Sequence, residues 1–116
     1  MIKVIVAGTR TFQNYNLLER KLTKILQNQA AVEIISGGAR GADTLGEKFA
    51  QQHGYKTTKF LPNWKAWGRQ AGYRRNLYMA QYATHLVAFW DGKSRGTAHM
   101  IEIAKAKGLR VRIIRY

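Results

Sequence analysis

Apolar runs of strand length alternate with segments of helical periodicity along the whole chain. The apolar runs fall at 2–7, 32–35, 55–60, 85–90 and 109–114, and the periodic segments at 16–28, 42–53, 69–82 and 97–107. In the first periodic segment the aliphatic residues that share the inner face are Leu17, Leu18, Leu22, Ile25 and Leu26. Strands and helices that alternate in this way predict an α/β fold with a parallel sheet.

The length of the chain limits how many such units it holds. Its 116 residues are enough for one hydrophobic core but not for two. There is no internal repeat, low-complexity tract or flexible linker, and the only long irregular stretch is 61–68. We therefore expect one domain with five strands and four helices.

The charge of the chain points to an anionic partner. Twenty Lys and Arg residues against six Asp and Glu residues give a formal net charge of +14. Such a charge favours a small phosphorylated ligand held in one site, or a polyanion such as nucleic acid spread over a surface. Charge that serves only solubility is the alternative, because net charge by itself says nothing about the fold.

Composition also predicts several absences. The chain has no cysteine, and its three histidines lack metal-ligand spacing, so we expect no disulfide, no metal site and no cofactor. No apolar stretch approaches the ~20 residues of a membrane span, and the first residues lack the regions of a secretory signal. A cytoplasmic protein without a membrane partner is expected.

Two glycine-containing turns follow the first two predicted strands. The first turn contains Gly8, Thr9 and Arg10, and the second contains Ser36, Gly37, Gly38, Arg40, Gly41 and Asp43. Glycine lets a backbone approach a ligand and direct its N–H groups at phosphate, the following helix adds its dipole, and arginine adds a fork of donors. Asp43 has two readings, a helix cap or local structural group and a partner of ribose hydroxyls.

A third turn of this kind follows the fourth strand, and it contains Asp91, Gly92, Ser94, Arg95, Gly96 and Thr97. Ligands of open α/β sheets bind beyond the carboxyl ends of the strands, where the strand order reverses. If the order is 3-2-1-4-5, the first and fourth strands are neighbours and their turns meet at that point. The three turns together therefore predict one composite phosphate-binding site.

The connector 63–76 interleaves aromatic and basic side chains. Rings can stack on a base while guanidinium groups neutralise phosphate, and we take Trp64, Arg75 and Asn76 as ligand candidates. For Trp67 a place in the core is the favoured reading. The basic cluster of the last helix and strand is expected to lie away from the site, on an edge of the sheet: Lys105, Lys107, Arg110, Arg112 and Arg115.

Four segments in this order form a family pattern: GTRTF, SGGARGAD, GYRRN and FWDGKSRGTAHMI. The chain resembles the YspA-like branch of the SLOG superfamily, whose relatives include the cytokinin-activating LOG enzymes and DNA-processing protein A. The resemblance covers almost the whole chain. It implies a single Rossmann-like domain over 1–116, with a five-stranded parallel sheet and helices on both faces, and assembly into dimers or larger homo-oligomers.

The resemblance also implies a ligand pocket and a function. The pocket residues that it implies are Gly8, Arg10, Gly37, Gly38, Arg40, Gly41, Asp43, Arg75, Asn76, Asp91, Ser94, Gly96 and Thr97. The implied function is sensing or sequestering of a nucleotide-derived ligand, such as an ADP-ribose-like signal, in bacterial or phage conflict systems. Single-stranded DNA binding, as in DNA-processing protein A, is an alternative.

One departure from the family pattern bears on catalysis. LOG phosphoribohydrolases carry a PGGxGTxxE signature whose glutamate assists cleavage of the N-glycosidic bond, whereas this chain has Met100 at that position. Glu102 lies ~200° further round the predicted helix and is no substitute. Asp43, Glu47 and Asp91 are the remaining weak catalytic candidates. We therefore favour a binding protein, with the phosphoribohydrolase as the alternative.

Overall fold

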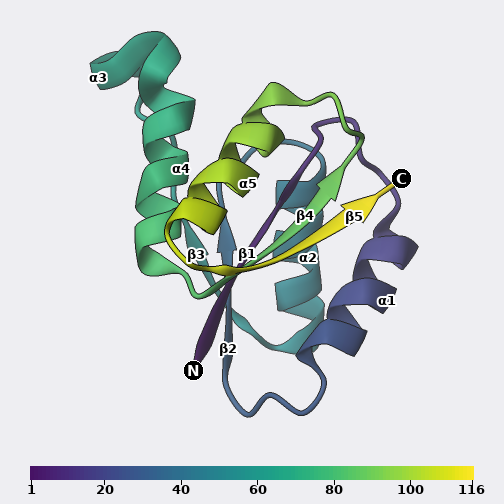
Figure 1. Cartoon of the computed structure of the whole chain (residues 1–116). Helices are drawn as coiled ribbons and strands as arrows, with labels where there is room; N and C mark the ends of the chain where they lie inside the picture. The colour runs from purple at the N-terminus through teal and green to yellow at the C-terminus, as the bar shows by residue number, and fades with distance from the viewer.

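Five parallel strands form the centre of the computed structural model, which describes all 116 residues (Figure 1). The strands are β1 (Ile2–Gly8), β2 (Val32–Ser36), β3 (Lys56–Lys59), β4 (His85–Trp90) and β5 (Arg110–Arg115). Their order in the sheet is β3-β2-β1-β4-β5, and every neighbouring pair is parallel. The predicted α/β class and the adjacency of the first and fourth strands are confirmed.

Helices cover both faces of the sheet. They are α1 (Tyr15–Leu26), α2 (Ala42–His53), the short α3 (Trp64–Trp67), α4 (Ala71–Tyr82) and α5 (Arg95–Ala106), with a 3-10 turn, η1 (Gly68–Gln70), before α4. Of the predicted inner face of α1, Leu18, Leu22 and Leu26 are buried, and Leu17 and Ile25 pack partly buried against the same core.

Two hydrophobic clusters fill the space between the sheet and the helices. One joins α1 and α2 to Val4, Val6, Ile34 and Phe89, and the other joins α4 and α5 to Ile5, Ala7, Ile35, Leu86 and Ala88. Successive residues of β1 and β2 thus enter opposite clusters. This explains the unbroken apolar runs in the sequence, because a central parallel strand is buried on both faces.

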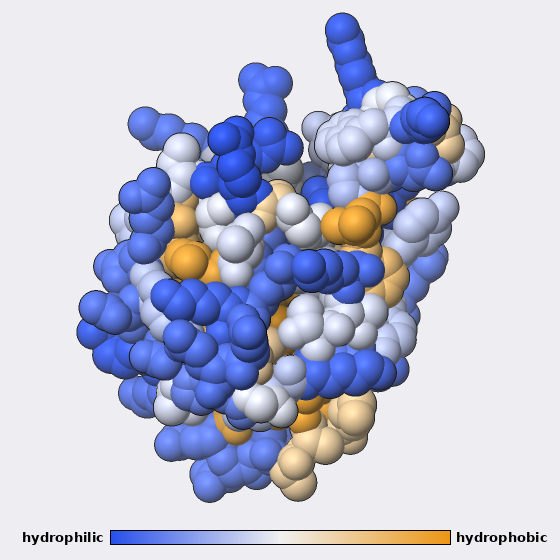
Figure 2. Space-filling model, turned by 180° about the vertical axis from the view of Figure 1, so that it is seen from behind, coloured by the Kyte–Doolittle hydropathy of each residue, from blue (hydrophilic) through white to orange (hydrophobic).

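The segment before α4 differs from the prediction. The stretch 61–68 was expected to be irregular, but Asn63 caps a helical turn, since its side chain accepts a hydrogen bond from Ala66 N at 3.0 Å. This turn stands off the body at one end of α4 (Figure 1), and a separate lobe is visible in Figure 2. The core position predicted for Trp67 is wrong: the residue is 44% exposed, and the Arg74 guanidinium lies 3.7 Å from its ring centroid.

The other differences are small. Helix α5 begins at Arg95, two residues earlier than predicted, because Ser94 caps it and its hydroxyl accepts a hydrogen bond from Thr97 N.

Gly54 ends α2 in the left-handed conformation, as expected for a helix C-terminus. The basic residues of the last helix and strand are exposed. Figure 2 shows the opposite face from Figure 1, and most of that face is hydrophilic. None of the helices has the length and hydropathy of a membrane span.

Candidate functional site

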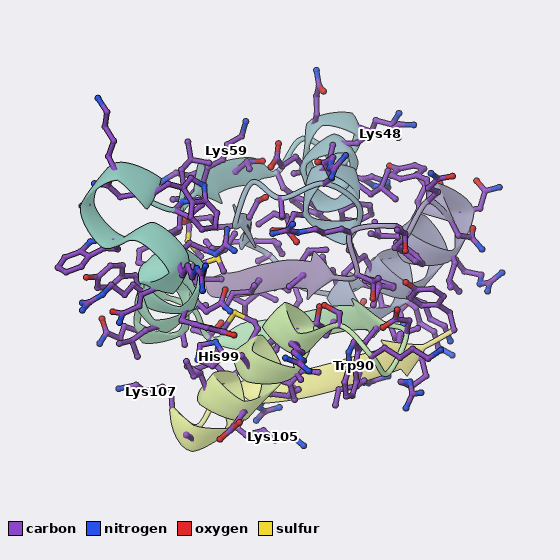
Figure 3. The ribbon with its side chains drawn as sticks, turned by 90° about the horizontal axis from the view of Figure 1, so that it is seen from above. Lys48, Lys59, Trp90, His99, Lys105 and Lys107 are labelled. Carbon is purple, nitrogen blue, oxygen red and sulfur yellow. The ribbon has the colours of Figure 1, made fainter.

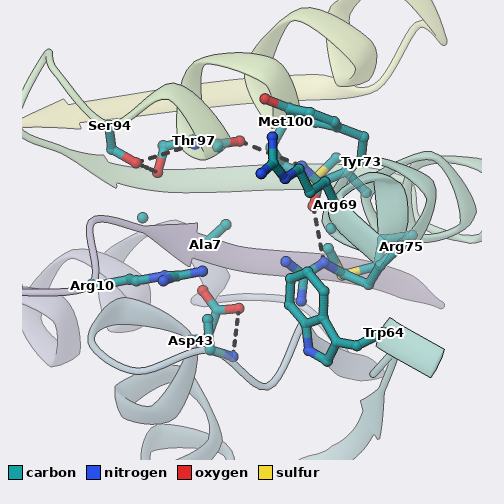
Figure 4. A pocket seen from close by; sticks show the side chains of 16 residues that line it. Ala7, Arg10, Asp43, Trp64, Arg69, Tyr73, Arg75, Ser94, Thr97 and Met100 are labelled. Atoms are coloured by element: carbon teal, nitrogen blue, oxygen red, sulfur yellow. Dashed lines mark hydrogen bonds between the residues drawn. The ribbon is translucent and has the colours of Figure 1, made fainter. Parts of the chain in front are cut away.

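A cavity of about 270 Å³ opens where β1 and β4 end, at the point where the strand order reverses (Figure 4). Four segments supply its walls: the end of β1 (Ala7, Gly8, Arg10), the β2–α2 loop and start of α2 (Ala39, Asp43), the α3–α4 region (Trp64, Arg69, Gly72, Tyr73, Arg75, Asn76, Met79) and the start of α5 (Ser94, Gly96, Thr97, Met100). The position is the one at which open α/β sheets bind their ligands.

A smaller cavity of about 130 Å³ adjoins the first. It is lined by Arg10, Gly37, Gly38, Ala39, Arg40, Pro62, Trp64 and Arg75. Because Arg10, Ala39, Trp64 and Arg75 line both spaces, the two cavities share a wall. The smaller one has no acidic residue in its lining.

Four arginines converge on these cavities, and none of them forms a salt bridge. They are Arg10, Arg40, Arg69 and Arg75. The three ion pairs of the protein join Glu19 to His53, Glu33 to Lys56 and Glu47 to Lys59, and none involves an arginine. Unpaired guanidinium groups in a concave site favour an anionic ligand, because phosphate or carboxylate oxygens match their donor geometry.

Arg75 is the most constrained of these arginines. Its Nε donates to Asn76 Oδ1 at 3.1 Å, and its Nη1 donates to the Gly37 carbonyl oxygen. Burial lowers the pKa of Arg75, and the nearby positive charge of Arg10 lowers it further, while Asp43 opposes both. These hydrogen bonds fix the guanidinium between the β2–α2 loop and α4.

Asp43 is the only acid in the lining of the large cavity. The residue is 6% exposed, and its Oδ2 accepts a hydrogen bond from Ala39 N at 3.3 Å. Burial raises the pKa of Asp43 to about 6, against the effects of that hydrogen bond and of Arg75. The helix-cap reading is wrong, since Gly41 occupies the N-cap position and receives no side-chain cap. Asp43 instead shapes the loop from inside while it faces the cavity.

Two consecutive amides of the β2–α2 loop, those of Gly38 and Ala39, are not free to bind a ligand. Gly38 N donates to Ser36 Oγ at 3.1 Å, and Ala39 N donates to Asp43. Ser36 is fully buried, and its hydroxyl donates to Glu47 Oε2 at 2.6 Å. The expectation that this loop points successive N–H groups at phosphate is therefore wrong for Gly38 and Ala39, because the loop uses these two amides itself.

Thr9 and Asp91 join the loops after β1 and β4. Asp91 N donates to Thr9 Oγ1 at 3.1 Å, while the Asp91 carboxylate accepts from Lys93 N at 2.8 Å and Ser94 N at 2.9 Å. The last two hydrogen bonds lower the pKa of Asp91. Neither Thr9 nor Asp91 lines a cavity, whereas the hydroxyls of Ser94 and Thr97, 3.0 Å apart, do.

Asn76 connects α4 to α5 at the back of the large cavity. Its Nδ2 donates to the Gly96 carbonyl at 3.4 Å and to His99 Nδ1 at 3.1 Å. The Tyr73 ring meets the His99 ring edge-on, with 4.4 Å between centroids, and Figure 3 shows His99 on the side of α5 that faces α4. These contacts hold the two helix starts apart at a fixed spacing.

The predicted ligand residues divide into three groups. Nine line the large cavity: Gly8, Arg10, Asp43, Trp64, Arg75, Asn76, Ser94, Gly96 and Thr97. Gly37, Gly38 and Arg40 line the smaller one. The remaining six line neither: Thr9, Ser36, Gly41, Asp91, Gly92 and Arg95. Of the weak catalytic candidates only Asp43 reaches a cavity, since Glu47 binds Ser36 and Lys59 and Asp91 binds backbone amides.

The sequence interpretation missed several wall residues, chiefly Arg69, Gly72 and Tyr73. A signal for them is present: Arg69, Gly72, Tyr73, Asn76 and Met79 recur at intervals of three, one, three and three. This spacing puts them on one face of a helix. Met100, at the position of the glutamate in LOG enzymes, is 1% exposed and adds an apolar side chain to the lining of the large cavity.

Comparisons with known proteins agree with this architecture. The sequence profile of the YspA, cpYpsA-related SLOG family matches residues 2–72. The Gene 61 protein of Mycobacterium phage D29 is 30% identical over 118 residues, which cover 96% of this chain and 94% of that protein.

The X-ray structure of TM1055 superposes with a TM-score of 0.71 at 22% sequence identity, over 96% of this chain and 72% of that one. A predicted subunit of tRNA methyltransferase from Methanocaldococcus jannaschii gives 0.47 at 13% identity, over 97% and 67%. The chain belongs to the YspA, cpYpsA-related SLOG family.

Proposed function

We propose that the cavity binds a nucleotide or nucleotide-derived ligand through its phosphate, and that the protein is a sensing or sequestering module for that ligand. The observation that carries the proposal is the convergence of four arginines that form no salt bridge beside two exposed aromatic rings. Membership of a SLOG family supports a nucleotide-related ligand. ADP-ribose-like signals and nucleoside monophosphates both belong to this class.

The cavity offers one set of residues to the phosphate of such a ligand and another to its base. Arg69 and Arg75, with the Ser94 and Thr97 hydroxyls at the start of α5, offer donors to a phosphate, and the helix adds the positive end of its dipole. Trp64 is 55% exposed and Tyr73 is 49% exposed, so both rings are open to stacking with a base. The volume of about 270 Å³ lies near the lower end of small-ligand sites and suits a mononucleotide unit.

The distribution of acids supports binding without cleavage as the first candidate. Hydrolysis of an N-glycosidic bond requires a group that transfers a proton within hydrogen-bond reach of the reacting atoms. Met100 supplies none, and Asp43 is held by Ala39 N beside Arg75. The phosphoribohydrolase reading is the second candidate, because the raised pKa of Asp43 would suit a general acid.

The test is a thermal-shift and calorimetric screen against AMP, ADP-ribose, cyclic ADP-ribose and NAD. We expect at least one to bind the wild type and to bind Arg10→Gln at least tenfold more weakly. The control is Arg20→Gln on α1, which removes the same charge from an exposed position outside both cavities. The proposal is wrong if no nucleotide binds, or if both variants weaken binding equally. Chromatography of the same mixtures decides between binding and hydrolysis, since release of free base would replace the binding role with the phosphoribohydrolase.

A further inference from the structure

The smaller cavity is a separate compartment with its own chemistry. Arg40 lines only this compartment, whereas Arg10 and Arg75 stand in the wall that it shares with the large cavity. Its other walls are the Gly37–Ala39 backbone, Pro62 and Trp64. Three guanidinium groups therefore surround about 130 Å³ with no carboxylate in the lining.

Side chains rather than the backbone are the recognition groups here. The amides of Gly38 and Ala39 are already bound to Ser36 and Asp43, and Arg75 is bound to the Gly37 carbonyl oxygen. Arg10 and Arg40 are exposed and are in none of the ion pairs. They are available to an incoming anion, and a guanidinium fork matches phosphate oxygens.

The charge of the two cavities together exceeds what one phosphate monoester supplies. Arg10, Arg40, Arg69 and Arg75 stand against the single acid Asp43. A phosphate monoester carries about −1.5 to −2 charges at pH 7, because its second pKa is near 6. One phosphate in the large cavity would leave Arg40, which lines only the smaller one, without a counter-charge.

We infer that the smaller cavity is a second phosphate subsite, so that the ligand is a nucleotide with two phosphate groups, one in each cavity, and Arg40 selects for the second. The inference rests on the proposed function and narrows its ligand class. The two compartments adjoin at Arg10, Ala39, Trp64 and Arg75, so one ligand can extend from one into the other. Arg40 is a specificity-determining residue in this scheme, since it touches the second phosphate only.

The experiment compares AMP with ADP by isothermal titration calorimetry in buffer without divalent cations. The wild type should bind ADP at least tenfold more tightly than AMP. In Arg40→Gln this gain should fall to less than threefold, while the Kd for AMP stays within twofold of wild type. Arg20→Gln should keep the full gain, and unchanged melting temperatures would show that both exposed positions leave the fold intact.

Four outcomes separate the two proposals. Equal affinity of the wild type for AMP and ADP would overturn the second subsite and leave the binding function standing. A loss of AMP and ADP affinity by the same factor in Arg40→Gln would also overturn it, because the arginine would then act as a general charge. Failure of the wild type to bind ADP while it binds ADP-ribose or NAD would overturn the second subsite only, whereas failure to bind any of AMP, ADP, ADP-ribose, cyclic ADP-ribose and NAD would remove the proposed function and the inference with it.

Discussion

Two pairs of glycines near the site differ in whether the surrounding structure has room for a side chain: Gly8 and Gly41 at the ends of loops, and Gly72 and Gly96 at the starts of helices. A Cβ on Gly41 would lie against the Thr9 carbonyl oxygen and 2.6 Å from the Arg10 carbonyl carbon, and a Cβ on Gly8 would come within 2.8 Å of the Ala42 Cβ. A Cβ on Gly96 would meet no atom within 4 Å, and one on Gly72 would meet only ordinary contacts. Gly8, at the end of β1, and Gly41 are therefore required by packing, whereas Gly72 and Gly96 leave space in the cavity.

This contrast changes how a glycine-rich loop is interpreted. Glycine within a helix costs up to about 1 kcal/mol relative to alanine, so a helical glycine without a packing reason indicates another requirement. Gly72 and Gly96 both line the large cavity from opposite helices. We therefore interpret the two helix starts as the surfaces that a ligand approaches closely, and the β2–α2 loop as a rigid wall.

Gly41→Ala should produce the largest effect. Gly41 has φ 80° and ψ −128°, a conformation that alanine rarely adopts, and the added Cβ would collide with backbone atoms. We expect a loss of about 3 kcal/mol or more of unfolding free energy, measured by urea denaturation. Gly54→Ala is the control, because it has a positive φ but open space, and should cost about 1 kcal/mol. Equal losses at the two positions would show that packing does not explain Gly41.

Asp43→Asn should give the next largest effect, and its sign depends on pH. Burial raises the pKa of the carboxyl from 3.8 to about 6 in the folded state, so the folded protein binds the proton more tightly than the unfolded chain. Stability from this group is therefore lost as the pH rises from about 4 to about 6, by about 3 kcal/mol at 1.4 kcal/mol per tenfold change.

The measurement for Asp43 is the difference in unfolding free energy between Asp43→Asn and the wild type at pH 4.5 and at pH 7.5. Subtraction removes the contributions of other titrating groups, such as Asp91, whose lowered pKa acts in the opposite direction. The asparagine variant should gain on the wild type at the higher pH. A difference that does not change with pH would show that the Asp43 carboxyl is not buried as described.

Gly96→Ala should have the smallest effect on stability and separate stability from binding. Alanine favours the helix, so α5 should gain up to about 1 kcal/mol, while the new methyl group should weaken nucleotide binding at least tenfold. Gly72→Ala should behave in the same way. Thr23→Ala, at an exposed position of α1, is the control that stabilises a helix without touching the cavity. Wild-type affinity in both glycine variants would mean that the helix starts are not close-approach surfaces.

The hydrophobic pattern was enough to predict the five strands and the four long helices, mostly to within one or two residues. These segments are defined by local periodicity and by apolar runs buried on both faces, which are visible in the sequence itself. Element α3 was not predicted, because its four residues show no period, and of its two tryptophans Trp67 was expected in the core and Trp64 at the site. The exposure of Trp67 is decided by where the chain turns before α4, which local pattern does not encode.

The sequence by itself determined the fold class, the edge of the sheet at which a site would form and the excess of positive charge there. Only the tertiary structure decided which residues of those turns face the site. Hydrogen bonds or packing between loops occupy Thr9, Ser36, Gly41 and Asp91. The cavity is lined instead by Gly72 and Tyr73 at the start of α4 and by Arg69 in the η1 turn before it. The type of a residue determines which ligands its side chain can bind. Whether that side chain is free to bind them depends on its hydrogen-bond and packing partners, which are often far away in the sequence.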